Sequence, residues 1–143
     1  MIIEEKEGRF IARNEKHTYG GRVLIEVKIN SALIEKIDTA LVAKVGYEDW
    51  IAGVREGIEF ALATINMPSI SIQVTRILGQ DMDTNPSILA AAGADAVWRS
   101  LNFTPTDTQR KFIELVAFDS WSRDYKFVPN LRSIEGNPLP TPF

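Results

Sequence analysis

One histidine and no cysteine limit the chemistry that this chain of 143 residues can support. Thiolate nucleophiles, thiolate metal ligands and disulfides need cysteine, and a histidine-based metal site needs more than one histidine. His17 stands in a predicted turn, so a Ser-His-Asp triad would have to be built around a loop residue. We therefore expect His17 to be an exposed turn residue, and we assign no catalytic residue, no metal and no cofactor.

Acidic and amide side chains alternate just before a predicted helix, at Asp81, Asp83 and Asn85. This spacing matches the beginning of an EF-hand calcium loop. Such a loop also needs glycine at its sixth position and a bidentate Glu at its twelfth, where this chain has Pro86 and Ala92. We expect Asp83 and Asn85 instead to satisfy the free amides at the start of the helix.

Basic side chains are scattered over the predicted sheet. They offer either a modest basic patch at one end of the sheet or an ordinary solvated surface, and the second is the default. The residues concerned are Arg9, Arg13, Lys16, Arg22 and Arg76. Because the formal net charge is -3, the chain as a whole does not attract polyanions. We expect direct nucleic-acid binding to be weak or absent.

The composition is that of one globular domain, since 45% of the residues are hydrophobic and 24% are charged over a length that can bury a single core. The first ten residues carry acids where a secretory signal would begin with basic residues. No run of about 18 apolar residues follows anywhere in the chain. We expect a cytoplasmic protein that has no membrane partner.

Residues 8–30 carry the alternation of a β-hairpin. Val23, Ile25 and Val27 would face a core, and the polar residues 16–21, which end in two glycines, would form the turn. The following residues, from Ser31 onward, have apolar side chains at steps of three and four, which favours a helix.

A helix, a strand and a second helix are predicted next. Acids at Glu48 and Asp49 suit the first turn of a helix. Gly53 and Gly57 cost that helix roughly 1 kcal/mol each relative to alanine, so we expect them to permit close packing against a sheet. A strand then alternates from Ile70 onward.

The second helix begins at Asn85 and Pro86, because an Asn cap followed by proline suits the first helical turn. It continues to Leu101 and has a thin, alanine-rich side that allows another helix to lie beside it. A further helix is predicted after Thr104. From Tyr125 onward, prolines indicate an extended tail, part of which should dock through its apolar residues.

Residues 47–101 resemble the second half of domain IV of the translocating elongation factors, elongation factor G and elongation factor 2. The shared order is an aromatic residue, a Gly-Val-rich helix, a proline, an alternating strand, a Gly-x-x-x-Asp turn and a Ser-x-Leu-Ala helix. The turn runs from Gly79 to Asp83, and the last motif begins at Ser87. The resemblance also implies a strand near residues 40–45, which leaves a short helical or irregular segment after Ser31.

In that family two loops at the tip of the domain reach the decoding centre beside transfer RNA. Asp83 matches the family aspartate, whereas Met82 and Asn85 replace a histidine and a second aspartate. The other loop is shorter here but keeps Gly20, Gly21 and Arg22. The binding residues that the resemblance implies are Lys16, His17, Gly20, Gly21, Arg22, Gln80, Asp81, Met82, Asp83 and Asn85.

The fold predicted from these patterns is an α+β, two-layer α/β sandwich, in which a mixed sheet of about four strands has two helices on one face. The resemblance implies the fold of ribosomal protein S5 domain 2. We expect residues 1–103 to form the domain IV-like part. Residues 104–143 would add a C-terminal helix and an extended, proline-containing tail.

The predicted function is that of a non-enzymatic binding or accessory protein, whose partner is the ribosome, RNA or another protein. No Gly-x-x-x-x-Gly-Lys-Ser/Thr loop for a GTPase motor occurs in the sequence. Two alternatives remain open. One is a small enzyme of the same fold group that uses Asp81 and Asp83, and the other is a homo-oligomeric accessory protein that assembles through its C-terminal tail.

Overall fold

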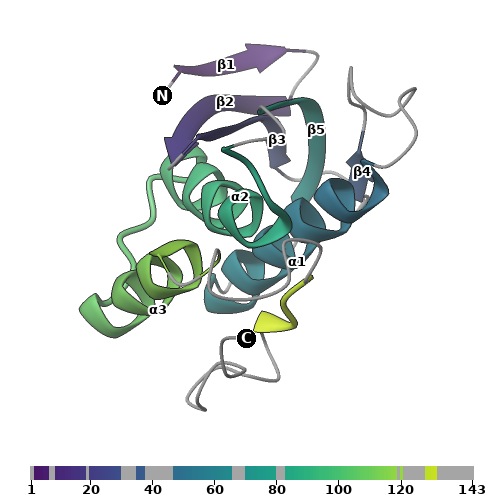
Figure 1. Cartoon of the computed structure of the whole chain (residues 1–143). Helices are drawn as coiled ribbons and strands as arrows, with labels where there is room; N and C mark the ends of the chain where they lie inside the picture. Colours follow the sequence, from purple (N-terminus) through teal and green to yellow (C-terminus); the bar gives the residue numbers. More distant parts are fainter. Residues whose placement is uncertain are drawn as a thin grey trace.

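The computed structural model describes residues 2–6, 9–18, 20–29, 35–37, 47–65, 70–79, 83–118, 120 and 128–131. These residues form a sheet of five strands and three helices (Figure 1). The strands are β1 (Ile2–Lys6), β2 (Arg9–Thr18), β3 (Gly21–Ile29), β4 (Glu35–Ile37) and β5 (Ile70–Gly79). The helices are α1 (Glu48–Thr64), α2 (Pro86–Ser100) and α3 (Asp107–Phe118).

The strands lie in the order β1-β2-β3-β5-β4. All neighbours are antiparallel except β4 and β5, which are parallel, so the sheet is mixed. The predicted α+β class and mixed sheet are confirmed, but the sheet has five strands where about four were expected. The difference lies at the edges, because β1 pairs with β2 at one edge and the short β4 pairs with β5 at the other.

The short helical or irregular segment predicted after Ser31 is wrong where the structure describes it. Glu35–Ile37 forms β4, which pairs in parallel with residues 72–74 of β5. Local periodicity is a weak guide here, because an adjacent strand offers a ladder of backbone hydrogen bonds that the sequence pattern does not reveal. The strand implied near residues 40–45 lies outside the described residues.

The predicted hairpin is confirmed as β2 and β3, but its turn is shorter than residues 16–21. Lys16 and His17 belong to β2, where they pair with Val23 and Arg22. The prediction of His17 as a turn residue is therefore wrong, although its side chain is exposed as expected. Gly20 has a φ angle of 96°, in a region that residues with a side chain rarely adopt.

The core lies between the inner face of the sheet and the helices. β3 contributes Val23, Ile25 and Val27 to it. On β5 the register shifts opposite Leu24 and Ile25, which leaves one extra residue on that strand. Since a bulge of this kind reverses which face the later side chains take, Val74 and Ile77 are both fully buried.

Helices α1 and α2 lie side by side on one side of the sheet, and α3 flanks α2 (Figure 1). The two glycines of α1 face α2 and not the sheet, contrary to the prediction. A Cβ atom on Gly53 would collide with the backbone of Pro86, and one on Gly57 with the backbone of Ala90. The alanine-rich α2 is almost entirely buried as a result.

Part of the predicted tail docks, since Pro129 and Leu131 are buried. Leu131 belongs to the core cluster formed by the sheet and the helices. Among the described residues no helix combines the length and the apolar character needed to cross a membrane.

Candidate functional site

The two predicted tip loops lie against each other in the structure. We use "the tip" for the described parts of the β2–β3 turn and the β5–α2 connection, namely Gly20, Gly79, Asp83 and Thr84. The Thr84 hydroxyl donates a 2.6 Å hydrogen bond to the carbonyl oxygen of Gly20. A Cβ atom on Gly20 would lie 2.5 Å from the Asp83 carbonyl oxygen. The tip is therefore a single packed unit.

Asn85 caps α2 as predicted, because its Oδ1 accepts a 2.9 Å hydrogen bond from the amide of Ile88. Asp83 is exposed, and among the described residues its side chain makes no capping bond, so that part of the prediction is wrong. The Asn85 Nδ2 atom is buried and has no hydrogen-bond partner within the described structure. Gln80, Asp81 and Met82 lie outside the described residues.

The remaining predicted residues of this region divide between two faces of the sheet. Lys16 is paired with the buried Val23, and its ammonium group reaches Asp95 of α2 at 3.2 Å. His17 and Arg22 are paired with each other, and Arg22 forms a 3.2 Å ion pair with Glu15. Because alternate residues of a strand point to opposite faces, Lys16 serves the helix side and His17 the other side.

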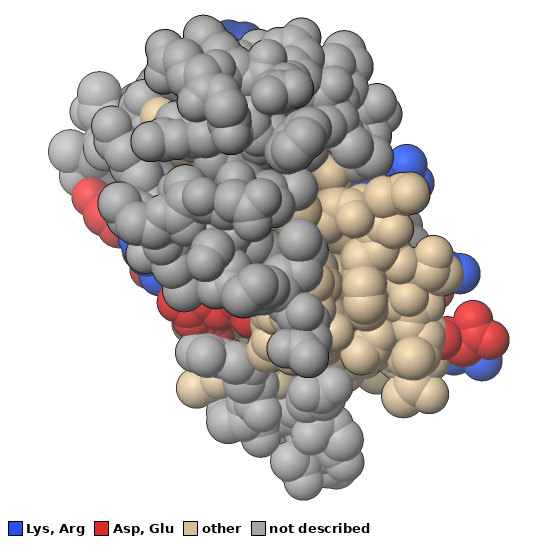
Figure 2. Space-filling view, turned by 180° about the vertical axis from the view of Figure 1, so that it is seen from behind, with Lys and Arg blue, Asp and Glu red and all other residues tan. Residues whose placement is uncertain are grey.

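The structure divides the described basic residues of the sheet between its two faces, so they do not form the single patch that was the less favoured alternative. Lys16 points toward the helices, whereas Arg22 and Arg76 are exposed on the opposite face of the sheet. The side chains of Arg9 and Arg13 lie outside the described part. Seen from behind (Figure 2), the described atoms form a broad area without charged side chains, with Lys, Arg, Asp and Glu at its right margin and further Asp or Glu at its lower left.

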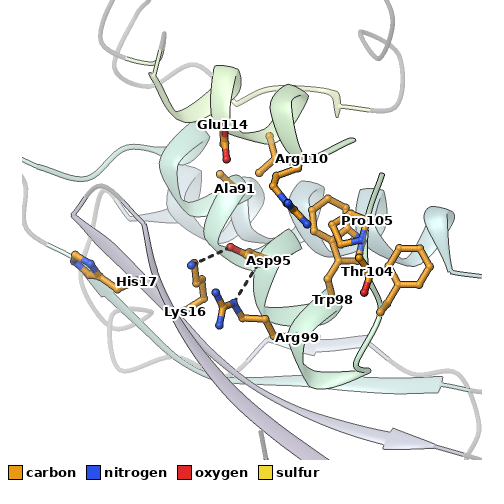
Figure 3. Close-up of a pocket in the computed structure, with 12 residues that line it drawn as sticks. Lys16, His17, Ala91, Asp95, Trp98, Arg99, Thr104, Pro105, Arg110 and Glu114 are labelled. Carbon is orange, nitrogen blue, oxygen red and sulfur yellow. Dashed lines mark ion pairs between the residues drawn. The ribbon is translucent and has the colours of Figure 1, made fainter. Parts of the chain in front are cut away.

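A half-open cleft of about 590 Å³ lies between the end of β2, the second half of α2, and α3 (Figure 3). We call this feature the cleft. It is lined by Lys16, His17, Ala91, Asp95, Trp98, Arg99, Phe103, Thr104, Pro105, Arg110, Ile113 and Glu114. Its volume falls within the range of small-molecule sites in proteins.

Asp95 holds two of the cations of the cleft in place. One carboxylate oxygen lies 3.2 Å from the Lys16 ammonium nitrogen, and the other lies 3.4 Å from the Arg99 Nε atom. Figure 3 shows both ion pairs, with His17 directed away from them. Since these side chains are partly exposed, each pair adds little to stability, and its main effect is to fix the positions of the charges.

Trp98 forms an apolar wall of the cleft, and contacts with α1 hold its side chain in place. Its indole nitrogen donates a 2.8 Å hydrogen bond to the Thr64 hydroxyl of α1. Phe60 of α1 meets Trp98 and also Phe112 of α3, with ring centroids 6.1 Å and 5.4 Å apart respectively. The three helices are thereby joined behind the wall of the cleft.

The α2–α3 connection is ordered by caps at both ends. Asn102 has a φ angle of 54°, and the amide of Phe103 donates a 2.8 Å hydrogen bond to the Trp98 carbonyl, as in a Schellman motif. At the start of α3, Thr106 and Gln109 form a capping box through two reciprocal side-chain bonds. Phe103 and Pro105 therefore have fixed positions at the edge of the cleft.

Among the described residues, Lys16 and His17 are the predicted binding residues that border the cleft, although the His17 side chain points toward the other face of the sheet. The cleft as a site was not predicted from the sequence. A signal for it exists in α2, where Ala91, Asp95 and Arg99 recur at steps of four and so share one helix face. The Thr-x-x-Gln capping box is a second signal, because it marks the start of α3. Neither shows that α3 turns back toward β2.

Comparisons with known proteins do not establish a family for this chain. No protein-family model matches it, and no curated protein matches it. Among solved structures it is similar to the Streptococcus pneumoniae phosphomevalonate kinase, with 9% sequence identity and a TM-score of 0.33. The match covers 78% of this chain and 38% of that chain, so it spans well under half of the kinase. This likeness is too weak to carry a functional argument.

Proposed function

We propose that this is a non-enzymatic binding protein with a ribosomal protein S5 domain 2-like fold, related to domain IV of the translocating elongation factors. Its partner is a protein or ribonucleoprotein that it contacts through the tip, in the cytoplasm. The observation that carries the proposal is the hydrogen bond of Thr84 to Gly20, which joins two turns 64 residues apart into one surface.

The packing of the tip supports a binding role. A side chain on Gly20 would collide with Asp83, and a side chain on Gly79 would collide with Thr84. A surface that is already ordered loses little conformational entropy when a partner binds, which favours affinity. Around this surface Asp83 and Arg22 are exposed and supply polar contacts of both signs.

The mixed charge of the tip favours a protein or ribonucleoprotein partner over bare nucleic acid. Arg22 is already paired with Glu15, and the chain carries a net charge of -3. Binding to a phosphate backbone depends on several unneutralised Lys and Arg side chains. The partner would therefore be recognised mainly by shape and by short polar contacts.

Co-sedimentation with ribosomes of the native host over a range of salt concentrations tests the proposal. Polar contacts at the tip should strengthen as the ionic strength falls. The Thr84→Val variant removes the hydroxyl that joins the two turns and should weaken co-sedimentation.

Thr75→Val is the matched control, because the Thr75 hydroxyl also donates to a backbone carbonyl, that of Leu24, but in the middle of the sheet. Co-sedimentation that is missing at low as well as at high salt would refute ribosome binding. Equal loss in the two variants would show that the tip is not the contact.

A further inference from the structure

We propose that the cleft is a separate binding site for a small organic anion, in which a carboxylate or phosphate group is attached to a flat apolar ring. This site goes beyond the proposed tip contact and does not depend on it. The proposal rests on the charges, the apolar wall and the fixed geometry of the cleft.

The charge of the cleft is opposite in sign to that of the whole chain. Among the described residues of the lining, three cations, Lys16, Arg99 and Arg110, accompany two carboxylates, those of Asp95 and Glu114, which gives this part of the lining a net charge of +1. The complete chain has a net charge of -3. A local excess of positive charge at a concave surface concentrates anions there.

Arg110 has its charge available to a ligand. Its guanidinium group makes no ion pair within the described structure, and in Figure 3 it extends from α3 toward Pro105 and Trp98. Asp95 contacts Arg99 only through the Nε atom, so the terminal nitrogens of Arg99 are not used by that pair. A planar guanidinium group suits carboxylate and phosphate oxygens because it presents several donors in one plane.

The other side of the cleft is apolar. Trp98, Phe103, Pro105 and Ile113 line it; Phe103 and Pro105 are partly exposed, whereas Trp98 and Ile113 are largely buried. Both Trp98 and the loop that carries Phe103 are held by hydrogen bonds. Fixed aromatic and proline side chains favour a flat apolar group over a flexible chain. A ligand that matches both sides of the cleft therefore carries an anionic group next to a ring.

NMR titration of the full chain tests this proposal with four probes: phenyl phosphate, benzoate, uncharged benzamide and inorganic phosphate. The reporter is the Trp98 indole N–H signal, assigned with a Trp98→Phe variant. We expect at least one of the two anionic ring compounds to shift this signal in a saturable manner, and the comparison of phenyl phosphate with benzoate identifies the preferred anionic group. Benzamide and inorganic phosphate should bind more weakly.

Arg110→Gln should raise the dissociation constant of the preferred probe about tenfold, because one charge-assisted contact is lost. Lys111→Gln is the matched control, since it removes the same charge from the next residue of α3, which is exposed and does not line the cleft. It should leave the dissociation constant within about twofold, as expected for a screened surface charge. Thermal unfolding of both variants verifies that they are folded.

Three results would overturn the proposal. The first is that neither anionic ring compound shifts the Trp98 signal. The second is that benzamide or inorganic phosphate binds as tightly as the preferred anionic ring compound, which would mean that binding does not require both the ring and the charge. The third is that the Lys111→Gln and Arg110→Gln variants weaken binding equally, which would indicate nonspecific attraction.

Discussion

Gly57 of α1 lies directly against the carbonyl group of Ala90 in α2, so a single added Cβ atom would collide with the backbone of the neighbouring helix. Close approach of two helix backbones is stabilising only if both surfaces are small, and α2 meets this condition with a run of buried alanines from Ala90 to Ala92. The contact fixes α2, and with it the positions of Asp95 and Trp98 in the cleft.

Gly57→Ala should therefore lower the free energy of unfolding by about 2 kcal/mol or more, although alanine is the better helix former by about 1 kcal/mol. Urea denaturation followed by circular dichroism measures this change. Gly93→Ala is the control, because its Cβ would lie 3.2 Å from the Val54 carbonyl oxygen and needs only a small adjustment. Equal destabilisation by the two substitutions would contradict the argument.

Thr64→Val should lower the free energy of unfolding by about 1 to 3 kcal/mol, because it leaves the buried indole N–H of Trp98 without an acceptor. Thr64→Ser keeps the hydroxyl and should restore most of the loss. The comparison is made by urea denaturation of the three proteins. If the serine variant is as unstable as the valine variant, packing of the threonine methyl group is the cause.

Asn85→Ala should lower the free energy of unfolding by about 1 kcal/mol, since α2 loses the cap on the Ile88 amide. Asn85→Ser should cost less than the alanine substitution, because serine is a good cap and removes the buried, unpartnered Nδ2 atom. Thermal unfolding of the two variants ranks them. The opposite order would show that the amide group has a further role at the tip.

Asp95→Asn should increase the affinity of the cleft for the preferred anionic ring compound, since it removes the carboxylate that forms ion pairs with Lys16 and Arg99. The free energy of unfolding should change by less than about 1 kcal/mol, because the ion pairs are partly exposed. Calorimetric titration and urea denaturation measure the two effects. Weaker binding by this variant would mean that Asp95 is needed to hold the cations in position.

The sequence was most informative where local chemistry decides the structure. The start of α1 at Glu48 and that of α2 at Pro86 follow from helix-dipole and capping preferences, which act within a single turn. The segment that forms β4 was predicted to be helical or irregular, because its pairing with β5 joins segments far apart in the chain. β1 was not predicted, since its partner residues on β2 are likewise set by pairing.

The two candidate sites differ in the same way. The turn residues of the tip are visible in the sequence, and in the structure the Thr84 hydroxyl joins the two turns by its hydrogen bond to Gly20. The cleft depends on where α3 lies relative to β2 and α2. The capping box marks the start of α3, but it does not determine the direction in which the helix then runs. Lys16 and His17 were predicted to share one turn, whereas both belong to β2, where their side chains alternate between the two faces of the sheet.

The position of β5 has a consequence for the order of folding. It is the last of the five strands along the chain, yet it lies between β3 and β4. During synthesis, therefore, one edge of β3 and the strand β4 lack the partner that they have in the described sheet until residues 70–79 have emerged. Unpaired strand edges promote aggregation, so a nascent chain that stalls before this point is a natural substrate for chaperones.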